Sequence, residues 1–199
     1  MITRKEMTRM LLKEGLLSCL VNNSFESVTV TSLCKASGIT RSTFYLHYSN
    51  IMEIVDDLVD DAIAYSKPGM VDNNNLQTIA NTLSAASNSV ALREAYDSIF
   101  DRLPLCQRII RHKKYLPLFL DEQISEYVLQ RIIGREKDRQ GLVMAEALGI
   151  SFDVGVSIFI FLVHGLYAVN KQYKWSQSDE WLEAQKIIFK LVYRGLQSR

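Results

Sequence analysis

Residues 29–48 read TVTSLCKASGITRSTFYLHY, and this pattern predicts two short helices joined by a tight turn. The first helix is expected over 31–37 and ends at Gly38, which adopts the left-handed conformation of a turn at no steric cost. The second helix is expected over 41–47, with Thr40 as its N-cap. Five residues are expected to form the inner face of the pair: Leu33, Ala36, Ile39, Phe44 and Tyr48.

The outer face of the second helix carries polar side chains near its N-terminus. In a helix-turn-helix, the second helix enters the major groove of DNA with its N-terminal residues foremost. Arg41 has the chemistry to read guanine or to bind a phosphate, and the hydroxyls of Ser42 and Thr43 suit phosphates or base edges. Tyr45 and His47 suit backbone oxygens. The alternative is a small helical bundle with a glycine turn and an ordinary polar surface.

This segment resembles the N-terminal DNA-binding domain of the TetR/AcrR family of bacterial repressors. The likeness rests on Phe25-Glu26, on Thr29 at the start of the first helix and on the run TRSTFYLHY over 40–48, and it covers about 5–66. It implies a regulator that binds double-stranded DNA as a homodimer. The expected DNA-binding residues are Thr29, Thr31, Lys35, Thr40, Arg41, Ser42, Thr43, Tyr45, His47 and Asn50.

Two positions depart from the family pattern. The family usually has a Lys at the start of the helix that follows the recognition helix, where this chain has Ile51. That phosphate contact is therefore lost or made by Asn50. The second departure is Ser37, where the family usually has Ala. The first departure motivates an alternative function, a helical protein-interaction module whose head no longer reads DNA.

The rest of the chain is also expected to be helical, which predicts an all-α protein. Helical patterns cover 3–21, 49–66, 76–102, 105–114, 117–138, 141–149, 151–172 and 179–197, and no alternating strand pattern of useful length occurs. The clearest break is at 66–75, where a Pro, a Gly and three Asn cannot extend a helix. The expected domains are a DNA-binding domain over 1–66 (about 1–48 plus a connecting helix over 50–66) and a helical domain over 76–199.

By the same resemblance, residues 76–199 are expected to bind an unknown small-molecule effector and to dimerise. Two apolar stripes support a dimer interface: Val154, Ile158, Phe161 and Leu162 on one helix, and Trp181, Ile188, Leu191 and Val192 on the last. Gly155 and Gly165 would let a partner helix approach closely. Two such helices from each chain make a four-helix bundle. The alternative is that both helices belong to the core of a monomer.

The effector pocket has only aromatic and histidine candidates, because no motif points to it. They are Tyr96, Phe100, Tyr115, Phe119, Tyr127, Phe159 and His164. An aromatic stripe is more often core than pocket, and a lone histidine on an apolar helix is more often a hydrogen-bonded core residue. A basic run over 108–114 either attracts an anion or forms a solvated helix face.

Composition narrows the class of protein. The 199 residues are 48% hydrophobic and 23% charged, with 9 Gly and 3 Pro, which excludes disordered, fibrous and small disulfide-rich chains. The net charge is only +1, but residues 1–50 carry six Lys or Arg and three Glu. An anionic partner is therefore expected to bind the basic N-terminal quarter.

Other compartments and activities find little support. The three cysteines have no metal-binding spacing and are expected to be reduced, and the charged N-terminus is no secretory signal. The uncharged run over 154–170 is short for a membrane span and predicts a buried helix in a cytoplasmic protein. No phosphate loop or catalytic motif is present, so we expect no enzyme and no cofactor. The acidic group Glu53, Asp56, Asp57, Asp60 and Asp61 either binds a metal or, as we expect, forms a solvated or salt-bridging face.

Overall fold

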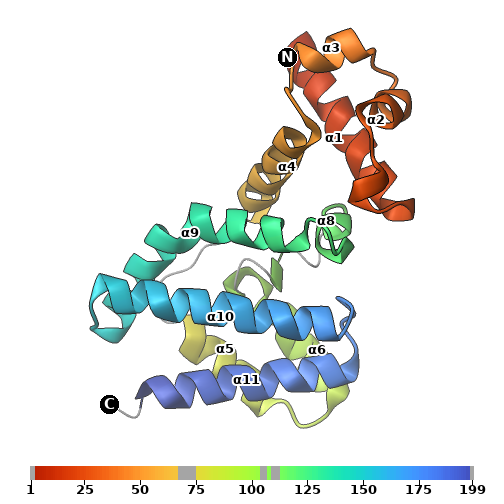
Figure 1. Ribbon diagram of the computed structural model, residues 1–199. Helices are drawn as coiled ribbons and strands as arrows, with labels where there is room; N and C mark the ends of the chain where they lie inside the picture. The colour runs from red at the N-terminus through yellow and green to blue at the C-terminus, as the bar shows by residue number, and fades with distance from the viewer. Residues whose placement is uncertain (1–2, 67–74, 104–106, 109–112, 198–199) are drawn as a thin grey trace. The chain divides into compact units, whose positions relative to one another are not determined.

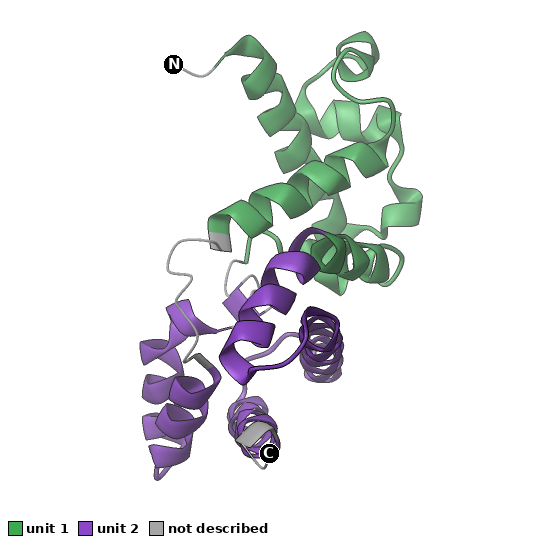
Figure 2. Cartoon of the chain, turned by 90° about the vertical axis from the view of Figure 1, so that its left-hand side faces the viewer, with its two compact units in different colours: residues 1–66, 109–134 green, residues 67–108, 135–199 purple. Residues whose placement is uncertain are grey.

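The computed structural model describes residues 3–66, 75–103, 107–108 and 113–197, and all regular structure in these ranges is helical (Figure 1). The all-α prediction is confirmed for this part of the chain. The chain divides into two compact units, residues 1–66 with 109–134 and residues 67–108 with 135–199 (Figure 2). The sequence placed residues up to 134 beyond the 66–75 break in the C-terminal domain, whereas the described residues 113–134 belong to the first compact unit.

The first unit is built from short helices around α1. Its elements are α1 (Arg4–Asn22), η1 (Phe25–Ser27), α2 (Val30–Ser37), α3 (Arg41–Tyr45), α4 (Ile51–Ser66), α8 (Leu116–Leu120) and the start of α9 (Ser125–Leu148). The α1 helix begins with a capping box, in which Thr3 Oγ1 accepts the Glu6 N–H at 3.2 Å and the Glu6 carboxylate accepts the Thr3 N–H at 2.7 Å. This reciprocal pair satisfies N–H groups that have no partner inside the helix.

The sequence predicts one apolar stripe on α1, and this stripe is only partly buried. Its residues at helical spacing are Met7, Met10, Leu11, Leu17, Leu20 and Val21. The buried side chains recur at a spacing of four, at Thr8, Leu12, Leu16 and Leu20, with Gly15 and Leu17 beside them. Met7, Met10, Leu11 and Val21 were expected on the same face but are 39–67% exposed. These four side chains are exposed because the neighbouring helices cover a narrower strip of α1 than its apolar residues occupy.

The α1 and α2 helices touch at two small residues. A Cβ atom on Gly15 would lie 2.0 Å from Ser37 Oγ and 3.3 Å from Leu33 Cδ1, so any larger residue requires the Ser37 side chain to shift. Ala36, which was expected on the inner face of the α2–α3 pair, is exposed. The Ser37 hydroxyl is buried there and makes no hydrogen bond.

The second unit consists of longer helices around an aromatic core. Its elements are α5 (Asn75–Ala85), α6 (Ser89–Ser98), η2 (Phe100–Arg102), the remainder of α9, α10 (Phe152–Gln172) and α11 (Asp179–Gln197). The helix predicted over 76–102 is interrupted because Asn88 caps α6, with Oδ1 accepting the Ala91 N–H at 2.9 Å. At the centre of the core, Tyr96 meets Trp181 edge to face with ring centroids 5.1 Å apart.

A pair of glycines brings α9 and α10 into backbone contact. A Cβ on Gly155 would lie 2.3 Å from the Gly141 oxygen and 3.0 Å from the Ala145 nitrogen. Gly155 therefore packs within the chain, which corrects the expectation that it faces a partner helix; Gly165 does have open space above it. The same contact explains why α9 runs unbroken through Gly141, where the sequence predicted two helices.

Replacing Gly155 tests this contact. We expect Gly155→Ala to lower the free energy of unfolding by about 1–3 kcal/mol, since the added methyl group has nowhere to go. Gly134→Ala is the matched control, because its Cβ would meet no atom within 4 Å. It should be neutral or stabilising by up to about 1 kcal/mol. Urea denaturation measures both, and equal stability of the two variants would contradict the packing described.

Candidate nucleic-acid interface

The turn between α2 and α3 is formed at Gly38, as the sequence predicted. Thr29 caps α2 reciprocally with Ser32, whose N–H donates to Thr29 Oγ1 at 3.1 Å and whose Oγ accepts the Thr29 N–H at 2.9 Å. Gly38 ends the helix with φ 66° and ψ 26°, the left-handed conformation. Ile39 then donates its N–H to the Cys34 carbonyl at 3.0 Å, which closes the turn.

The α3 helix is shorter than predicted and ends at Tyr45. Thr40 caps it, accepting the Thr43 N–H at 3.2 Å, and its hydroxyl lies 2.9 Å from the hydroxyls of both Ser42 and Thr43. His47 donates its N–H to the Phe44 carbonyl at 2.9 Å as part of the turn that follows. The N-terminus of α3 is therefore a cluster of three hydroxyl groups beside Arg41.

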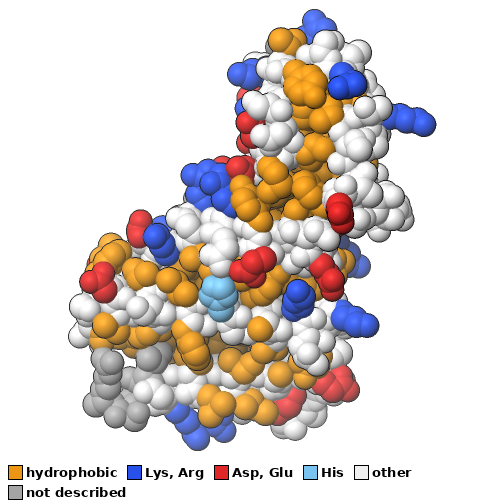
Figure 3. All heavy atoms as spheres, viewed as in Figure 1, with side chains coloured by type: hydrophobic (Ala, Val, Ile, Leu, Met, Phe, Trp, Pro, Cys, Tyr) orange, Lys and Arg blue, Asp and Glu red, His pale blue; other side chains and the backbone are white. Residues whose placement is uncertain are grey.

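The buried face of α3 leaves its polar face outward. Phe44 and Tyr48 are 0% and 3% exposed, as the sequence predicted. Tyr45 packs edge to face on Phe44 with centroids 5.1 Å apart and is still 53% exposed. Of the ten expected DNA-binding residues, eight are exposed (Thr29, Thr31, Lys35, Thr40, Arg41, Ser42, Tyr45 and Asn50), and Thr43 and His47 are half-buried. Figure 3 shows Lys and Arg side chains around the end of this unit where α1 begins and α3 lies.

Asn50 is the N-cap of α4. Its Oδ1 accepts the Glu53 N–H at 3.1 Å, while the Glu53 carboxylate accepts the Ser49 N–H at 2.8 Å. Ser49 and Asn50 both have side chains suited to an N-cap, and the structure uses Asn50. Because the oxygen is used in the cap, the amide NH₂ group is the part of Asn50 that remains suited to a phosphate.

A buried polar group fixes the end of the α3 segment to α1 and α4. The Tyr48 hydroxyl donates to Asp57 at 2.7 Å and accepts from Arg9 Nε at 3.2 Å, while Arg9 also donates to Asp57 and lies 4.9 Å from the centroid of the Tyr48 ring. Burial, together with the hydrogen bond to Asp57, raises the pKa of Tyr48 above its ordinary value. The hydrogen bond to Asp57 likewise raises the pKa of Arg9.

The acidic residues of α4 pair with basic residues. One turn beyond Asp57, Asp61 pairs with Lys13 of α1. Asp56 accepts a hydrogen bond from the Tyr127 hydroxyl at 2.6 Å and lies 2.8 Å from Arg131 Nε. These contacts agree with the salt-bridging alternative. The part of the chain that the structure describes contains no group of three or more His, Cys, Asp or Glu placed to hold a metal ion.

The expected pocket residues fall in both compact units. Tyr115, Phe119 and Tyr127 belong to the first compact unit, and the other four (Tyr96, Phe100, Phe159 and His164) to the second. Tyr96 is a core residue at 2% exposure, and Phe100 packs against the same core. Of the basic run over 108–114, Arg108 is 6% exposed, Lys114 pairs with Glu14 at 2.5 Å, and residues 109–112 lie outside the described ranges.

The expected dimer residues separate into core and surface. Trp181 is 1% exposed and lies inside the core, so it is corrected from interface to core residue. Ile158, Leu162, Ile188 and Val192 are half-buried. Val154, Phe161 and Leu191 are 41%, 72% and 65% exposed. In Figure 3 the hydrophobic side chains of this unit gather over α10 and α11.

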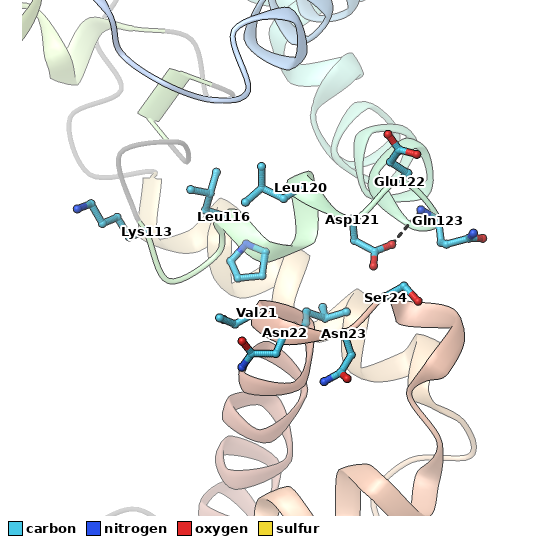
Figure 4. Close-up of a pocket in the computed structure, with 12 residues that line it drawn as sticks. Val21, Asn22, Asn23, Ser24, Lys113, Leu116, Leu120, Asp121, Glu122 and Gln123 are labelled. Atoms are coloured by element: carbon cyan, nitrogen blue, oxygen red, sulfur yellow. Dashed lines mark hydrogen bonds between the residues drawn. The ribbon is translucent and has the colours of Figure 1, made fainter.

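Sequence reasoning missed a hollow of about 630 Å³ in the first unit (Figure 4). It lies between the C-terminal end of α1 and the α8 segment, and none of the seven expected pocket residues lines it. Asp121 points from the turn after α8 toward Ser24 (Figure 4). Asp121 had a detectable signal, since an Asp side chain commonly accepts backbone N–H groups two or three residues on and so forms a turn. The packing of this turn against α1 had none.

Among the described residues, α10 is the one helix long and apolar enough to cross a membrane, a criterion that core helices of other proteins also meet, and 28% of its most apolar window is buried. The expectation of a buried helix thus holds for one side of α10 only.

The sequence matches no family model, and comparisons with curated proteins and with solved structures found no match.

Tyr48 and Tyr45 allow a matched comparison of a buried hydroxyl that holds the fold with an exposed hydroxyl that does not. We expect Tyr48→Phe to lower the free energy of unfolding by about 1 kcal/mol, because it removes the hydroxyl that joins Arg9 and Asp57. Tyr45→Phe removes the same atom from an exposed side chain and should leave stability within about 0.5 kcal/mol of the wild type. Thermal denaturation followed by circular dichroism compares them, and a larger loss in Tyr45→Phe would contradict the arrangement.

Proposed function

We propose that this chain is a sequence-specific DNA-binding regulator of transcription, with α2 and α3 as a helix-turn-helix. The observation that carries the proposal is the five-residue α3 helix, which buries Phe44 and presents Arg41, Ser42 and Tyr45 outward. The left-handed Gly38 and the two threonine caps are what such a motif requires. The resemblance of residues 5–66 to the TetR/AcrR family supports the same function.

A second copy of the chain is the proposed partner of the apolar face on α10 and α11. Phe161 and Leu191 are each more than half exposed there, and Gly165 offers open space for a partner helix. Two helices from each copy would form a four-helix bundle. A dimer also suits the DNA-binding role, because paired heads match half-sites about one helical turn, roughly 34–36 Å, apart.

The regulator is proposed to be a cytoplasmic, ligand-responsive repressor. A small-molecule effector would shift the dimer between two states by its differential affinity for them. The second candidate is a protein-interaction module with a head that no longer reads DNA. Its supporting observation is Ile51, which leaves α4 without a basic residue at its first position. Sequence-specific DNA binding separates the two functions.

DNA binding is tested by fluorescence anisotropy on DNA from upstream of the chain's own gene, with scrambled DNA as control, at ~0.15 M salt. We expect specific binding at least about a thousandfold tighter than scrambled binding. Arg41→Ala should relax base preference at one position of the site, whereas Tyr45→Phe should weaken binding to all sequences about equally. Equal, weak and salt-sensitive binding to both DNAs would favour the protein-interaction module.

Dimerisation is tested by a charge placed on the exposed apolar face. We expect Leu191→Asp to shift the protein from dimer to monomer in sedimentation velocity, because the charge would be buried without a partner. Val90→Asp is the control, since Val90 is 68% exposed on α6. It should leave the sedimentation coefficient unchanged. If wild type and Leu191→Asp sediment alike, the proposed interface is wrong.

A further inference from the structure

Asp121 uses its two carboxylate oxygens in different directions. Oδ1 accepts the N–H groups of Gln123 at 2.9 Å and Ile124 at 3.2 Å, and so holds the turn that leads into α9. Oδ2 accepts the Phe25 N–H at 2.6 Å, at the first residue of η1. The side chain thus joins the beginning of α9 to the segment immediately before α2. Figure 4 shows it between these two parts of the chain.

The first turns of α9 are also held on α4. Tyr127 and Arg131, one turn apart, both contact the Asp56 carboxylate, at 2.6 and 2.8 Å. Within the same unit, Gln123 reaches Glu26 of η1 at 3.5 Å. The start of α9 is therefore attached to both the entry and the exit of the α2–α3 pair, by charged groups in each case.

The α9 helix also belongs to the second compact unit. It is continuous from Ser125 to Leu148, and its residues from 135 onward pack in that unit, where Gly141 contacts Val156 of α10. Because α9 is one continuous helix, a displacement of its C-terminal half can be passed to its N-terminal half. The close approach of Gly155 to the Gly141 oxygen leaves α10 no room to move nearer to α9.

We propose that the Asp121 carboxylate is the coupling residue of this regulator, transmitting displacements of α9 to Phe25 and hence to the setting of α2 and α3. The inference rests on the proposed DNA-binding function and names its route of regulation. Asp121 is a positioning residue: it contacts the backbone before the recognition motif and no DNA. Its chemistry is specific, since an Asn has a single acceptor oxygen and serves one side of the bridge at a time.

Hydrogen exchange on the full-length protein without DNA tests the bridge. We expect Asp121→Asn to reduce the protection of the Phe25 amide, and of the amides of α2 and α3, about tenfold, in line with the loss of a charge-assisted hydrogen bond. Glu122→Gln, an equal loss of charge at the neighbouring exposed residue, should change neither by more than about twofold. Asp121→Glu, which keeps both oxygens, should recover protection at least partly. Loss confined to Phe25, or an equal effect of Glu122→Gln, overturns the proposal.

A double-mutant cycle tests transmission along α9. Gly141→Ala displaces α9 from Val156, because its Cβ would lie 2.3 Å from Val156 Cγ2, whereas a Cβ on Gly134 meets nothing within 4 Å. We expect Gly141→Ala to change exchange in α2 and α3 in the wild-type background and to have less than half that effect with Asp121→Asn. Gly134→Ala should have no effect in either. Additive effects of the two substitutions overturn the coupling.

An operator-based measurement separates this inference from the proposed function. With palindromes whose half-site spacing varies by single base pairs, the wild type should prefer one spacing, and Asp121→Asn should bind several spacings within about threefold. A weaker but equally sharp preference shows a purely structural role and overturns the inference. If the wild type binds no DNA specifically, the proposed function fails, while the exchange experiments still decide whether Asp121 couples α9 to α2 and α3.

Discussion

A helix of five residues does not hold its shape in water, so α3 depends on the burial of Phe44 and Tyr48. Tyr48 does more than fill space, because its hydroxyl is held between Arg9 of α1 and Asp57 of α4. The same side chain thus closes the apolar core beneath α3 and joins the helices on either side of it. The outward position of Arg41 and Tyr45 is a consequence of this anchoring.

The packing of the other helices depends on the positions where glycine lets two helices approach closely. Gly15 brings α1 against α2 at Ser37, and Gly155 brings α10 against α9 at Gly141. A Cβ atom would meet backbone atoms of α9 at Gly155 and the Ser37 side chain at Gly15, so both positions are sensitive to a small substitution. The α9 helix has residues in both compact units.

Local chemistry accounts for the parts of the fold that could be predicted. The cap at Thr40, the left-handed Gly38 and the buried Phe44 and Tyr48 are all short-range features, and they are confirmed. The failures involve distant partners. Trp181 and Leu191 lie on the same predicted apolar stripe of α11, yet Trp181 is buried in the core and Leu191 is exposed at the surface. The stripe is wider than the part of the helix that the rest of the chain covers.

The sequence by itself determined an all-helical chain, the helix boundaries that depend on caps and turns, and the polar face of α3, since each follows from neighbours within a few residues. Tertiary structure alone decided that 113–134 packs with the N-terminal helices, that Gly155 is used within the chain, and that Asp121 reaches Phe25. These depend on contacts between distant residues, such as Asp121 and Phe25, which are 96 positions apart. No periodicity in the sequence records which distant surface a helix face will meet, because many partners bury the same apolar area equally well.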